Sequence, residues 1–507
     1  MGEIFFPPIW AVLWYTYYKQ HLVKMKGCKM KLVKTLFAAP IMAISFTLAL
    51  NASAEDWYVS DDMEYGKGVV SDAHCTNDLQ AAASLATSGT TIWVKDGFVW
   101  KTGWATAVDK NQGSAPIGTN RVVIANGNVT LRSESGHWSG GATIRGQWDS
   151  EKSDGRGLHS IRCLRAKGTV KVIGLRFEDG SSPVNDSDGN AGGGGVFFNS
   201  NNSVLSNCLV TGCTAIRGGG VYSGTLYNCV ISNNVAKTSG GGCLYSQLVG
   251  CIVISNRTTA GSAGGAGGNG RKPTSICARD TVFIGNAAPA GNSAGGGACD
   301  MLLQNCLFEG NSAGGYGGGS SGCTSYNCTY LRNVRPSDGA NNRGGGAVGG
   351  GTHYNCLFAY NAAAAYGGAA YGGTFYNCTA YANTNTMEKG NHSGGFEASD
   401  CKVINSISYG NVGLDDNPGI ASNSCLQRAT IPASWVDCVN VDPRLDAALR
   451  PHARVCKRAG LVFEWMTDEA DVRSKDLAGN PRIAPGKEKP DMGCYETPFT
   501  GLMLIVR

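Results

Sequence analysis

The heptapeptide Asn305-Cys306-Leu307-Phe308-Glu309-Gly310-Asn311 is one of nine occurrences of a pattern between Leu205 and Asn411. Its first register, the Cys position, holds Cys208, Cys229, Cys251, Thr281, Cys306, Cys328, Cys356, Cys378 and Ser406. Five residues later the second register is Asn in every repeat but the first: Cys213, Asn234, Asn256, Asn286, Asn311, Asn333, Asn361, Asn383 and Asn411. Successive repeats begin 21 to 30 residues apart. Such a period is typical of a solenoid with loops inserted in some of its turns.

The composition of each unit indicates the kind of solenoid. Apolar residues stand three before and two after the first register, as Leu226 and Ile231 do around Cys229. This spacing is too short for helix pairs and indicates short strands. Glycine clusters such as Gly218-Gly219-Gly220 permit tight bends and close backbone approach. The unit therefore predicts an all-β parallel β-helix whose coils pair about 4.8 Å apart, with Asn side chains hydrogen-bonding along the axis at one bend.

Composition and charge agree with a large exported β protein. The chain has 507 residues, 73 of them glycine, and 16% are charged. The formal charge of +5 comes from the first 54 residues, which hold six lysines and one glutamate; the remainder carries 37 basic and 37 acidic residues. A neutral chain of this kind is not expected to bind nucleic acid or an anionic membrane surface.

The amino end has the pattern of an export signal. Five lysines between residues 24 and 34 precede an apolar run at 36–50 and the small residues Ala52-Ser53-Ala54. We expect a signal peptide within residues 1–54, a mature chain from about Glu55, and no transmembrane span in that mature chain. The apolar stretch Ile4 to Tyr18 indicates an over-long start, with a membrane anchor as the alternative. The apolar stretch 501–506 is too short to span a bilayer and is expected to form a last strand.

Twenty cysteines in an exported protein usually form disulfides. Here seven of them share the first register, which predicts a column of small side chains that pack as free thiols on the core side of a bend. Stacked neighbours would lie close enough to bond, but their parallel Cβ directions disfavour it. A reduced ladder is therefore favoured over disulfides. The better disulfide candidates lie outside the ladder: Cys425, Cys438, Cys456 and Cys494.

The remaining segments divide the chain around the repeats. After the leader (1–54), residues 55–180 are expected to form an amino-terminal cap and the first coils, residues 181–411 the Gly/Asn/Cys-rich repeats, and residues 412–507 a closing segment. A short helix at residues 77–86 would cover the open strand edge at the start of the stack. Further strands are expected at 91–94, 122–131, 142–146 and 170–177.

Several motifs resemble known β-helix families over residues 70–500. The glycine clusters with Phe283-Ile284-Gly285-Asn286 and Phe358-Ala359-Tyr360-Asn361 resemble the repeats of chlamydial polymorphic outer membrane proteins, which are surface adhesins. The stretches Asp476 to Ile483 and Asp491 to Glu496 are similar to the close of choice-of-anchor Q proteins, and Asp78 to Gly97 resembles the amino-terminal cap of pectin-lyase-like folds. The resemblance implies a right-handed parallel β-helix and a role at the cell surface.

No catalytic constellation is recognised in the repeats. A polysaccharide lyase needs a basic residue and carboxylates, usually with calcium, and a glycosidase needs two carboxyl groups facing one cleft. The few acids between Gly192 and Asn411 share no register in neighbouring coils. Asp280 stands where other repeats have Asn, and we interpret it as a turn residue. His353 stands alone in a mostly apolar register, where a packed histidine is more common than a catalytic one.

Two weaker patterns are candidate sites. Asp186, Asp188 and Asn190 begin like a calcium loop, but Phe197 stands where the bidentate glutamate is expected, so a polar turn is favoured over calcium binding. Tyrosines occupy the position two before the first register in several repeats, which predicts an outward column. Such a column could bind sugar rings or a partner, but cross-coil stacking alone would also explain it and is the favoured interpretation. These tyrosines are Tyr227, Tyr326, Tyr354 and Tyr376.

The sequence thus predicts a secreted or cell-surface protein, at the bacterial surface or outer membrane, with a structural or adhesive role. Its expected partner is a polysaccharide or another cell-surface molecule, and no cofactor is expected apart from the calcium alternative. The second hypothesis is a polysaccharide lyase or glycoside hydrolase, because this fold hosts both enzymes and adhesins.

Overall fold

The structure is a computed structural model. It describes residues 56–67, 72–108, 116–157, 159–182, 191–268, 277–336, 344–364, 366–386, 392–483 and 487–497. The expected signal peptide, the calcium-loop candidates Asp186, Asp188 and Asn190, and the expected last strand at 501–506 lie outside the described residues. Among the residues that are described, no helix is both long and apolar enough to cross a membrane.

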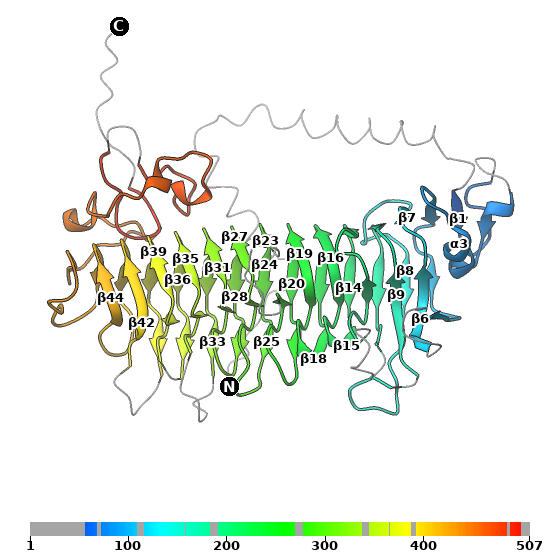
Figure 1. The fold of residues 1–507 in the computed structure, drawn as a ribbon, viewed down its shortest axis with the longest axis horizontal. Coiled ribbons are helices and arrows are strands. Elements are labelled where there is room, and N and C mark those ends of the chain that lie inside the picture. Colours follow the sequence, from blue (N-terminus) through cyan, green and yellow to red (C-terminus); the bar gives the residue numbers. More distant parts are fainter. Residues whose placement is uncertain are drawn as a thin grey trace, which may run out of the picture. The chain divides into compact units, whose positions relative to one another are not determined.

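The described chain is a right-handed parallel β-helix, and Figure 1 shows its strands side by side along the stack. The coils contribute strands to three sheets, the third of which extends only from Thr214 to Asn385. The first and largest sheet has 24 strands: β1 (Trp57–Val59), β2 (Cys75–Thr76), β3 (Thr91–Val94), β5 (Ala105–Val108), β6 (Pro116–Ile124), β7 (Val129–Ser133), β9 (Ile161–Ala166), β10 (Val170–Ile173), β12 (Val196–Phe198), β13 (Val204–Ser206), β16 (Val221–Tyr227), β19 (Cys243–Val249), β22 (Ala266–Gly267), β23 (Cys277–Arg279), β26 (Ala298–Cys299), β27 (Leu302–Gln304), β30 (Ser320–Ser321), β31 (Thr324–Tyr326), β34 (Val348–Gly349), β35 (Thr352–Tyr354), β38 (Ala370–Tyr371), β39 (Thr374–Tyr376), β42 (Phe396–Ile404) and β44 (Asn417–Ser422).

The second sheet has 13 strands and the third has eight. The second comprises β4 (Val99–Trp100), β8 (Thr143–Arg145), β11 (Arg176–Glu178), β14 (Leu209–Thr211), β17 (Val230–Ser232), β20 (Ile252–Ile254), β24 (Val282–Ile284), β28 (Leu307–Glu309), β32 (Thr329–Leu331), β36 (Leu357–Ala359), β40 (Thr379–Tyr381), β43 (Ile407–Tyr409) and β45 (Cys425–Leu426). The third comprises β15 (Thr214–Arg217), β18 (Val235–Ser239), β21 (Arg257–Thr258), β25 (Ala287–Ala288), β29 (Ser312–Ala313), β33 (Val334–Arg335), β37 (Ala362–Ala363) and β41 (Thr384–Asn385).

The amino-terminal cap contains the expected helix. It is α3 (Leu79–Leu85), whose first turn is capped by the Asp78 side chain accepting from the Ala81 amide. The face that carries Leu79 and Ala82 is fully buried, so the helix covers the first strands as expected. The sequence missed two bends in this region, because residues 122–131 and 170–177 each form two strands, interrupted at Asn128 and Gly174, which have positive φ.

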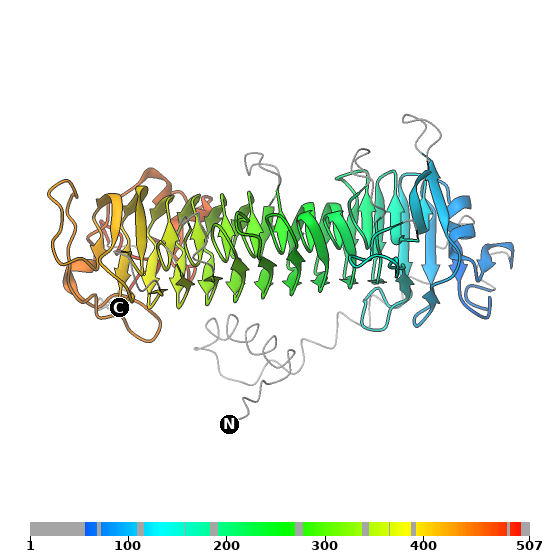
Figure 2. The ribbon, with the colours of Figure 1, turned by 90° about the horizontal axis from the view of Figure 1, so that it is seen from below.

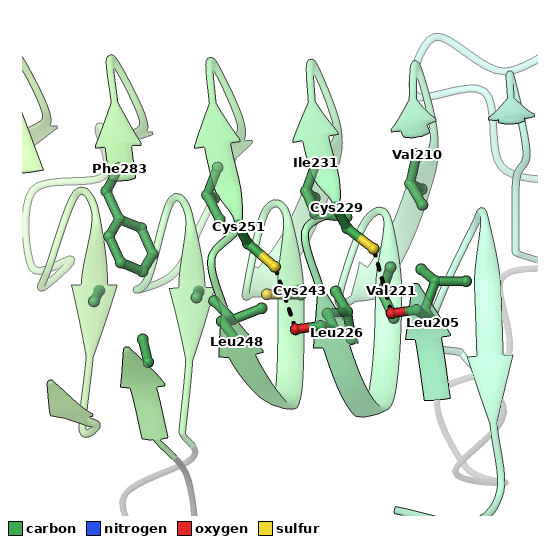
Figure 3. Close-up of a cluster of buried hydrophobic side chains, with 14 of the residues drawn as sticks. Leu205, Val210, Val221, Leu226, Cys229, Ile231, Cys243, Leu248, Cys251 and Phe283 are labelled. Atoms are coloured by element: carbon green, nitrogen blue, oxygen red, sulfur yellow. Dashed lines mark hydrogen bonds between the residues drawn. The ribbon is translucent and has the colours of Figure 1, made fainter. Parts of the chain in front are cut away.

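One continuous core follows the inward registers of the stack. Leu205, Leu226 and Leu248 point inward from the first sheet, opposite Val210 and Ile231 from the second (Figure 3). Further along, Phe283, Phe308 and Tyr330 stack with ring centroids 4.5 and 4.7 Å apart. The predicted apolar registers are therefore the core.

The first register is a buried column at the bend between the first and second sheets. Most ladder thiols donate to a backbone carbonyl one coil back, as Cys229 does to Leu205 O at 3.4 Å and Cys251 to Leu226 O at 3.3 Å (Figure 3). Cys328 donates within its own coil, to Tyr326 O at 3.3 Å. Burial raises the pKa of the Cys229 thiol, so it stays protonated. Every cysteine side chain that the structure describes is a free thiol.

The second register forms the predicted asparagine ladder. Asn333, for example, accepts through Oδ1 from the Asn311 amide at 3.1 Å and from Asn311 Nδ2 at 3.0 Å, and donates through Nδ2 to Phe308 O at 3.0 Å. The same contacts recur from Asn234 to Asn383, and all these side chains are fully buried. Each amide thus satisfies backbone groups that the bend would otherwise bury unpaired.

Glycine is required where the coils approach each other most closely. A Cβ at Gly219 would lie 2.4 Å from Gly241 O, and one at Gly241 would lie 2.2 Å from Gly264 O. The glycine clusters therefore let the backbones of successive coils lie in direct contact, as the sequence predicted.

The stack continues for one coil beyond Asn411. Strands β44 and β45 pair in parallel with β42 and β43, and Gln427 Oε1 takes the place of the ladder oxygen by accepting from the Asn411 amide at 3.0 Å. The chain then turns back along the stack as the C-terminal cover, the name used here for described residues 428–483 and 487–497 (Figures 1 and 2). Its regular elements are three short 3-10 helices, η2 (Arg454–Cys456), η3 (Glu464–Met466) and η4 (Val472–Ser474), which with η1 (Asp72–His74) in the cap make four in the described chain.

Candidate functional site

The predicted tyrosine column lies on the outer side of the first sheet. Tyr326, Tyr354 and Tyr376 stand on the neighbouring strands β31, β35 and β39, and their rings stack with centroids 5.3 and 4.9 Å apart. Tyr227 lies on β16, several coils away, and is 41% exposed. The structure therefore brings three of the four tyrosines together and leaves the fourth alone.

The C-terminal cover packs against two of the three stacked tyrosines, Tyr354 and Tyr376. Trp465 meets the Tyr354 ring edge-on at 5.8 Å, Phe463 meets Tyr376 at 5.5 Å, and the Arg473 guanidinium lies 5.4 Å from the Tyr354 centroid. Tyr354 and Tyr376 thus also make an intramolecular contact, in addition to the cross-coil stacking expected as the alternative. Binding of a partner by Tyr227, Tyr326, Tyr354 or Tyr376 stays a prediction.

Asparagines at the neighbouring bend also bind the cover. Asn355, in the αL conformation (φ 56°), donates through Nδ2 to Arg473 O at 3.0 Å and to Lys475 O at 2.7 Å. Asn405 donates to Leu461 O at 2.8 Å and accepts from the Leu461 amide at 2.6 Å. The Asn directly before the first register, as at Asn355 and Asn405, therefore serves both as an αL bend residue and as an anchor for the cover.

The closing motif identified in the sequence forms a buried ionic network inside the cover. Arg482, fully buried, donates to Glu496 Oε1 at 2.9 Å and to Asn355 Oδ1 at 3.0 Å. Lys487 donates to Glu496 Oε2 at 3.1 Å and lies 3.6 Å from Asp491. Burial raises the pKa of Glu496, against the two cations beside it. The charges of this motif thus hold the cover together.

His353 is a core residue, as the sequence favoured. It is fully buried on β35 and stacks on Phe375 with centroids 5.0 Å apart, while its Nε2 contacts Gly350 O at 3.0 Å. Burial lowers its pKa to about 4, so it is neutral at physiological pH. This histidine has no access to a substrate.

The sequence missed a charged cluster on the outer face of the second sheet, at neighbouring strands β8 and β11. Glu178 accepts from Arg145 Nη2 at 2.6 Å through Oε2 and from Arg176 Nη2 at 2.8 Å through Oε1. Asp179 lies 3.8 Å from Arg145 Nε. The side chains of Arg145 and Asp179 are 44% and 57% exposed, whereas that of Glu178 is 11% exposed. Two cations and two carboxylates therefore share one open face.

An exposed tryptophan borders this charged cluster. Trp148 is 48% exposed, and its Nε1 donates to Gly212 O at 2.9 Å. The Asp179 side chain packs against the same glycine: a Cβ added at Gly212 would lie 2.7 Å from Asp179 Oδ1. The charged cluster with Trp148 (Trp148, Arg145, Arg176, Glu178 and Asp179) thus combines an aromatic face with guanidinium and carboxylate groups.

The two carboxyl groups of the cluster have different environments. Burial alone would raise the pKa of Glu178, but hydrogen bonds from Arg145 and Arg176 outweigh it and lower that pKa. Desolvation raises the pKa of Asp179, although its exposure to water limits this shift. Glu178 is thus held as a carboxylate, and its strong acceptor positions are used by the arginines.

The signal for this cluster was present in the sequence in part. Arg176, Glu178 and Asp179 give three charges within four residues of an otherwise neutral solenoid. Their alignment with Arg145 depends on the β8–β11 pairing, and the first coils lack the Asn-Cys register that would have revealed it. Among the described residues, no group of three or more His, Cys, Asp or Glu side chains could hold a metal ion.

Comparison with known proteins gives likeness of fold. No family model and no curated protein matches this sequence. Among solved structures, the chain is similar to pectate lyase Pel9A (14% identity, TM-score 0.35, covering 89% of this chain and 98% of that one) and to a rhamnogalacturonan lyase (12%, 0.30, 87% and 99%). It is also similar to the Dettilon tailspike protein gp208 (12%, 0.30, 65% and 59%).

Proposed function

We propose that this chain is an exported, cell-surface β-helix protein with a structural and adhesive role, and that it binds polysaccharide at the charged cluster with Trp148. The observation that supports this best is the placement of an exposed indole beside two arginines and two carboxylates on one open face. Aromatic faces pack on the apolar faces of sugar rings, and guanidinium groups bind carboxylate and hydroxyl oxygens through several N–H donors at once.

The hydrogen bonding of Glu178 favours binding over proton transfer. Both of its oxygens accept from arginines, so it is a poor general base and instead fixes the two guanidinium planes. A general base must reach the substrate proton with an unoccupied acceptor. The remaining N–H groups of the exposed Arg145 are then oriented for an oxygen-rich ligand.

A retention and cleavage screen tests this proposal. The purified protein, without the leader, is passed over immobilised neutral and acidic polysaccharides with and without calcium, and soluble products are measured in parallel. We expect retention without cleavage. Trp148→Ala should weaken binding about fivefold, since a ring contact contributes about 1 kcal/mol, and Arg145→Ala about tenfold, since a hydrogen bond to a charged group contributes about 1.5 kcal/mol. Retention unchanged in both variants would contradict the site.

Tyr360→Ala is the matched control for the ring. Tyr360 is 51% exposed and lies 5.8 Å from Arg332, which pairs with Glu309 at 2.9 Å. This second aromatic–arginine–glutamate group lacks the additional arginine and aspartate of the charged cluster. Its loss is expected to leave retention unchanged.

A polysaccharide lyase or glycoside hydrolase is the second candidate function, because Glu178 and Asp179 have pKa shifts in opposite directions. Neighbouring carboxyl groups whose pKa values diverge are typical of acid/base pairs. If the screen releases products, Asp179→Asn should abolish their release while retention persists. Product release that survives Asp179→Asn would remove this cluster from consideration as a catalytic site.

A further inference from the structure

Two cysteines join the last coil to the C-terminal cover. Cys425 lies on β45, next to Ile407 in the outward row of the second sheet. Cys456 ends η2 in the cover. Both are fully buried in one small apolar cluster together with Ile407, Ala453 and Met492. The two side chains thus approach each other from different elements across the contact between stack and cover.

The two thiols act on each other in the docked chain: their interaction lowers the pKa of Cys425 and raises the pKa of Cys456. Cys425 Sγ also donates to Val441 O at 3.2 Å. Before the cover docks, either cysteine can supply the thiolate that attacks a disulfide.

Ladder thiols touch one another as well, but their arrangement differs. Cys229 has ladder neighbours on both sides, Cys208 and Cys251, which leave the same bend of successive coils in the same direction. Its proton is also held by Leu205 O and Tyr227 O, at 3.4 and 3.3 Å. Parallel Cβ directions do not suit the disulfide torsion near 90°.

Other cysteines differ from this pair in their surroundings. Cys163 and Cys213 meet inside the core of the stack, so a bond between them would not join the cover to a coil. Donation to a carbonyl does not separate the pairs, because Cys163 donates to Glu178 O at 3.3 Å and Cys425 to Val441 O at 3.2 Å. Of the remaining disulfide candidates, Cys494 belongs to a separate cluster with Leu357 and Ala359, and Cys438 packs on the main core. The structure thus divides the four disulfide candidates into one adjacent pair and two that lie apart.

We propose that Cys425 and Cys456 form a disulfide when the chain folds in an oxidising compartment. The thiolate of one of these cysteines attacks the disulfide of a thiol–disulfide oxidoreductase, whose S–S bond breaks to give a mixed disulfide and one oxidoreductase thiolate. The thiolate of the other cysteine then displaces the oxidoreductase sulfur from the mixed disulfide and forms the Cys425–Cys456 bond. Overall two thiols lose two protons and two electrons, and the disulfide of the oxidant is reduced to its dithiol.

Burial of both sulfurs sets the time at which this reaction occurs. In the folded chain neither thiol is accessible to an enzyme, so the bond must form before or while the cover docks. It would then fasten the cover to the last coil and keep the end of the stack closed against pairing with other strands. A covalent link of this kind acts chiefly by restricting the undocked state.

Thiol mapping of the full chain tests the proposal. The protein is reduced, refolded in a glutathione redox buffer, alkylated under denaturing conditions and digested with trypsin. Trypsin releases Val403–Arg428 and Val455–Lys457, each with a single cysteine. We expect these two peptides joined in most molecules and the ladder cysteines alkylated. Alkylation of both Cys425 and Cys456, or a preponderance of other pairs, would overturn the proposal.

Proteolysis supplies a second readout. Tryptic release of fragments from the cover should accelerate at least tenfold when the oxidised protein is treated with dithiothreitol. Cys456→Ser should release them at the faster rate with or without reductant, whereas Cys438→Ser should behave as the unmodified chain does. If dithiothreitol does not change the rate of tryptic release from the unmodified chain, the proposed disulfide is contradicted. If Cys456→Ser fails to fold, the peptide map still decides. Since the buffer supplies the oxidant, the outcome does not depend on export or on polysaccharide binding.

Discussion

The asparagine ladder of the coils and the C-terminal cover bury polar groups by opposite means. In the ladder the buried groups are neutral amides, each shared with the next coil, as Asn333 is with Asn311 and Asn361. In the cover they are charges, with Arg482 and Lys487 neutralising Glu496. A neutral ladder can be extended by repetition, because every rung has the same partners. A charged network occurs once and depends on one geometry, so the loss of one member leaves an unpaired buried charge.

The largest effect is expected when Arg482 is removed from the charged network of the cover. Arg482→Ala leaves Glu496 buried without its main partner, which is expected to weaken docking of the cover by about 3–5 kcal/mol. Trypsin should then cleave within residues 428–497 while far-UV circular dichroism of the stack is unchanged. Lys489→Ala, which removes an exposed cation nearby, is the control. Loss of the β signal together with the cover would show that the two regions are one cooperative unit.

Acid is expected to destabilise the stack of coils through His353. Its pKa falls from 6.5 in the unfolded chain to about 4 in the stack, so between these pH values the unfolded state binds more protons. Stability is therefore complete above pH 6.5 and falls as the pH drops, by about 3 kcal/mol at pH 4. His353→Phe, which keeps a ring against Phe375, should lose this dependence. Urea midpoints at pH 7 and pH 4 measure it, and equal acid sensitivity in both proteins would refute this origin.

Asn333→Ala sharpens the account of the ladder. The change removes the acceptor of the Asn311 amide and the donor to Phe308 O, and the expected loss is about 2 kcal/mol of unfolding free energy, read from the urea midpoint. Asn305→Gly at the exposed αL bend should change it by less than about 0.5 kcal/mol. If both substitutions cost the same, the ladder would add nothing beyond turn propensity.

The smallest expected effect concerns the ring contacts of the cover. Trp465→Ala removes the contacts with Tyr354 at 5.8 Å and with Arg473 at 5.2 Å. Docking should weaken by about 1 kcal/mol, seen as a several-fold faster tryptic release. Tyr227→Ala, in the same register but away from the cover, should leave that release unchanged. A similar acceleration in both variants would exclude a specific role for the covered tyrosines.

Prediction from sequence succeeded where residues repeat and failed where they do not. The periodic registers placed Leu226, Ile231 and Asn234 correctly, because each repeat tests the same alignment again. The contact between Tyr354 and Trp465 could not be foreseen, since it joins residues far apart in sequence through a segment with no period. The charged cluster was missed for the same reason: Arg145 and Glu178 meet through a pairing of irregular early coils. Asp280 was interpreted as a turn residue in the register of Asn355, but the role of Asn355 as an anchor depends on the returning chain.

The asparagine ladder has a direction. From Asn234 to Asn383, each Asn donates its backbone N–H and one Nδ2 hydrogen to Oδ1 of the following rung, as Asn234 does to Asn256. The other Nδ2 hydrogen goes to a backbone carbonyl of the preceding coil. At one end Cys213 offers only its backbone N–H, and at the other Gln427 supplies the final oxygen. A whole coil can therefore be deleted or duplicated in phase, and the two new neighbours will match. Gene duplication can thus set the length of such a protein by counting units, with no need to redesign either terminus.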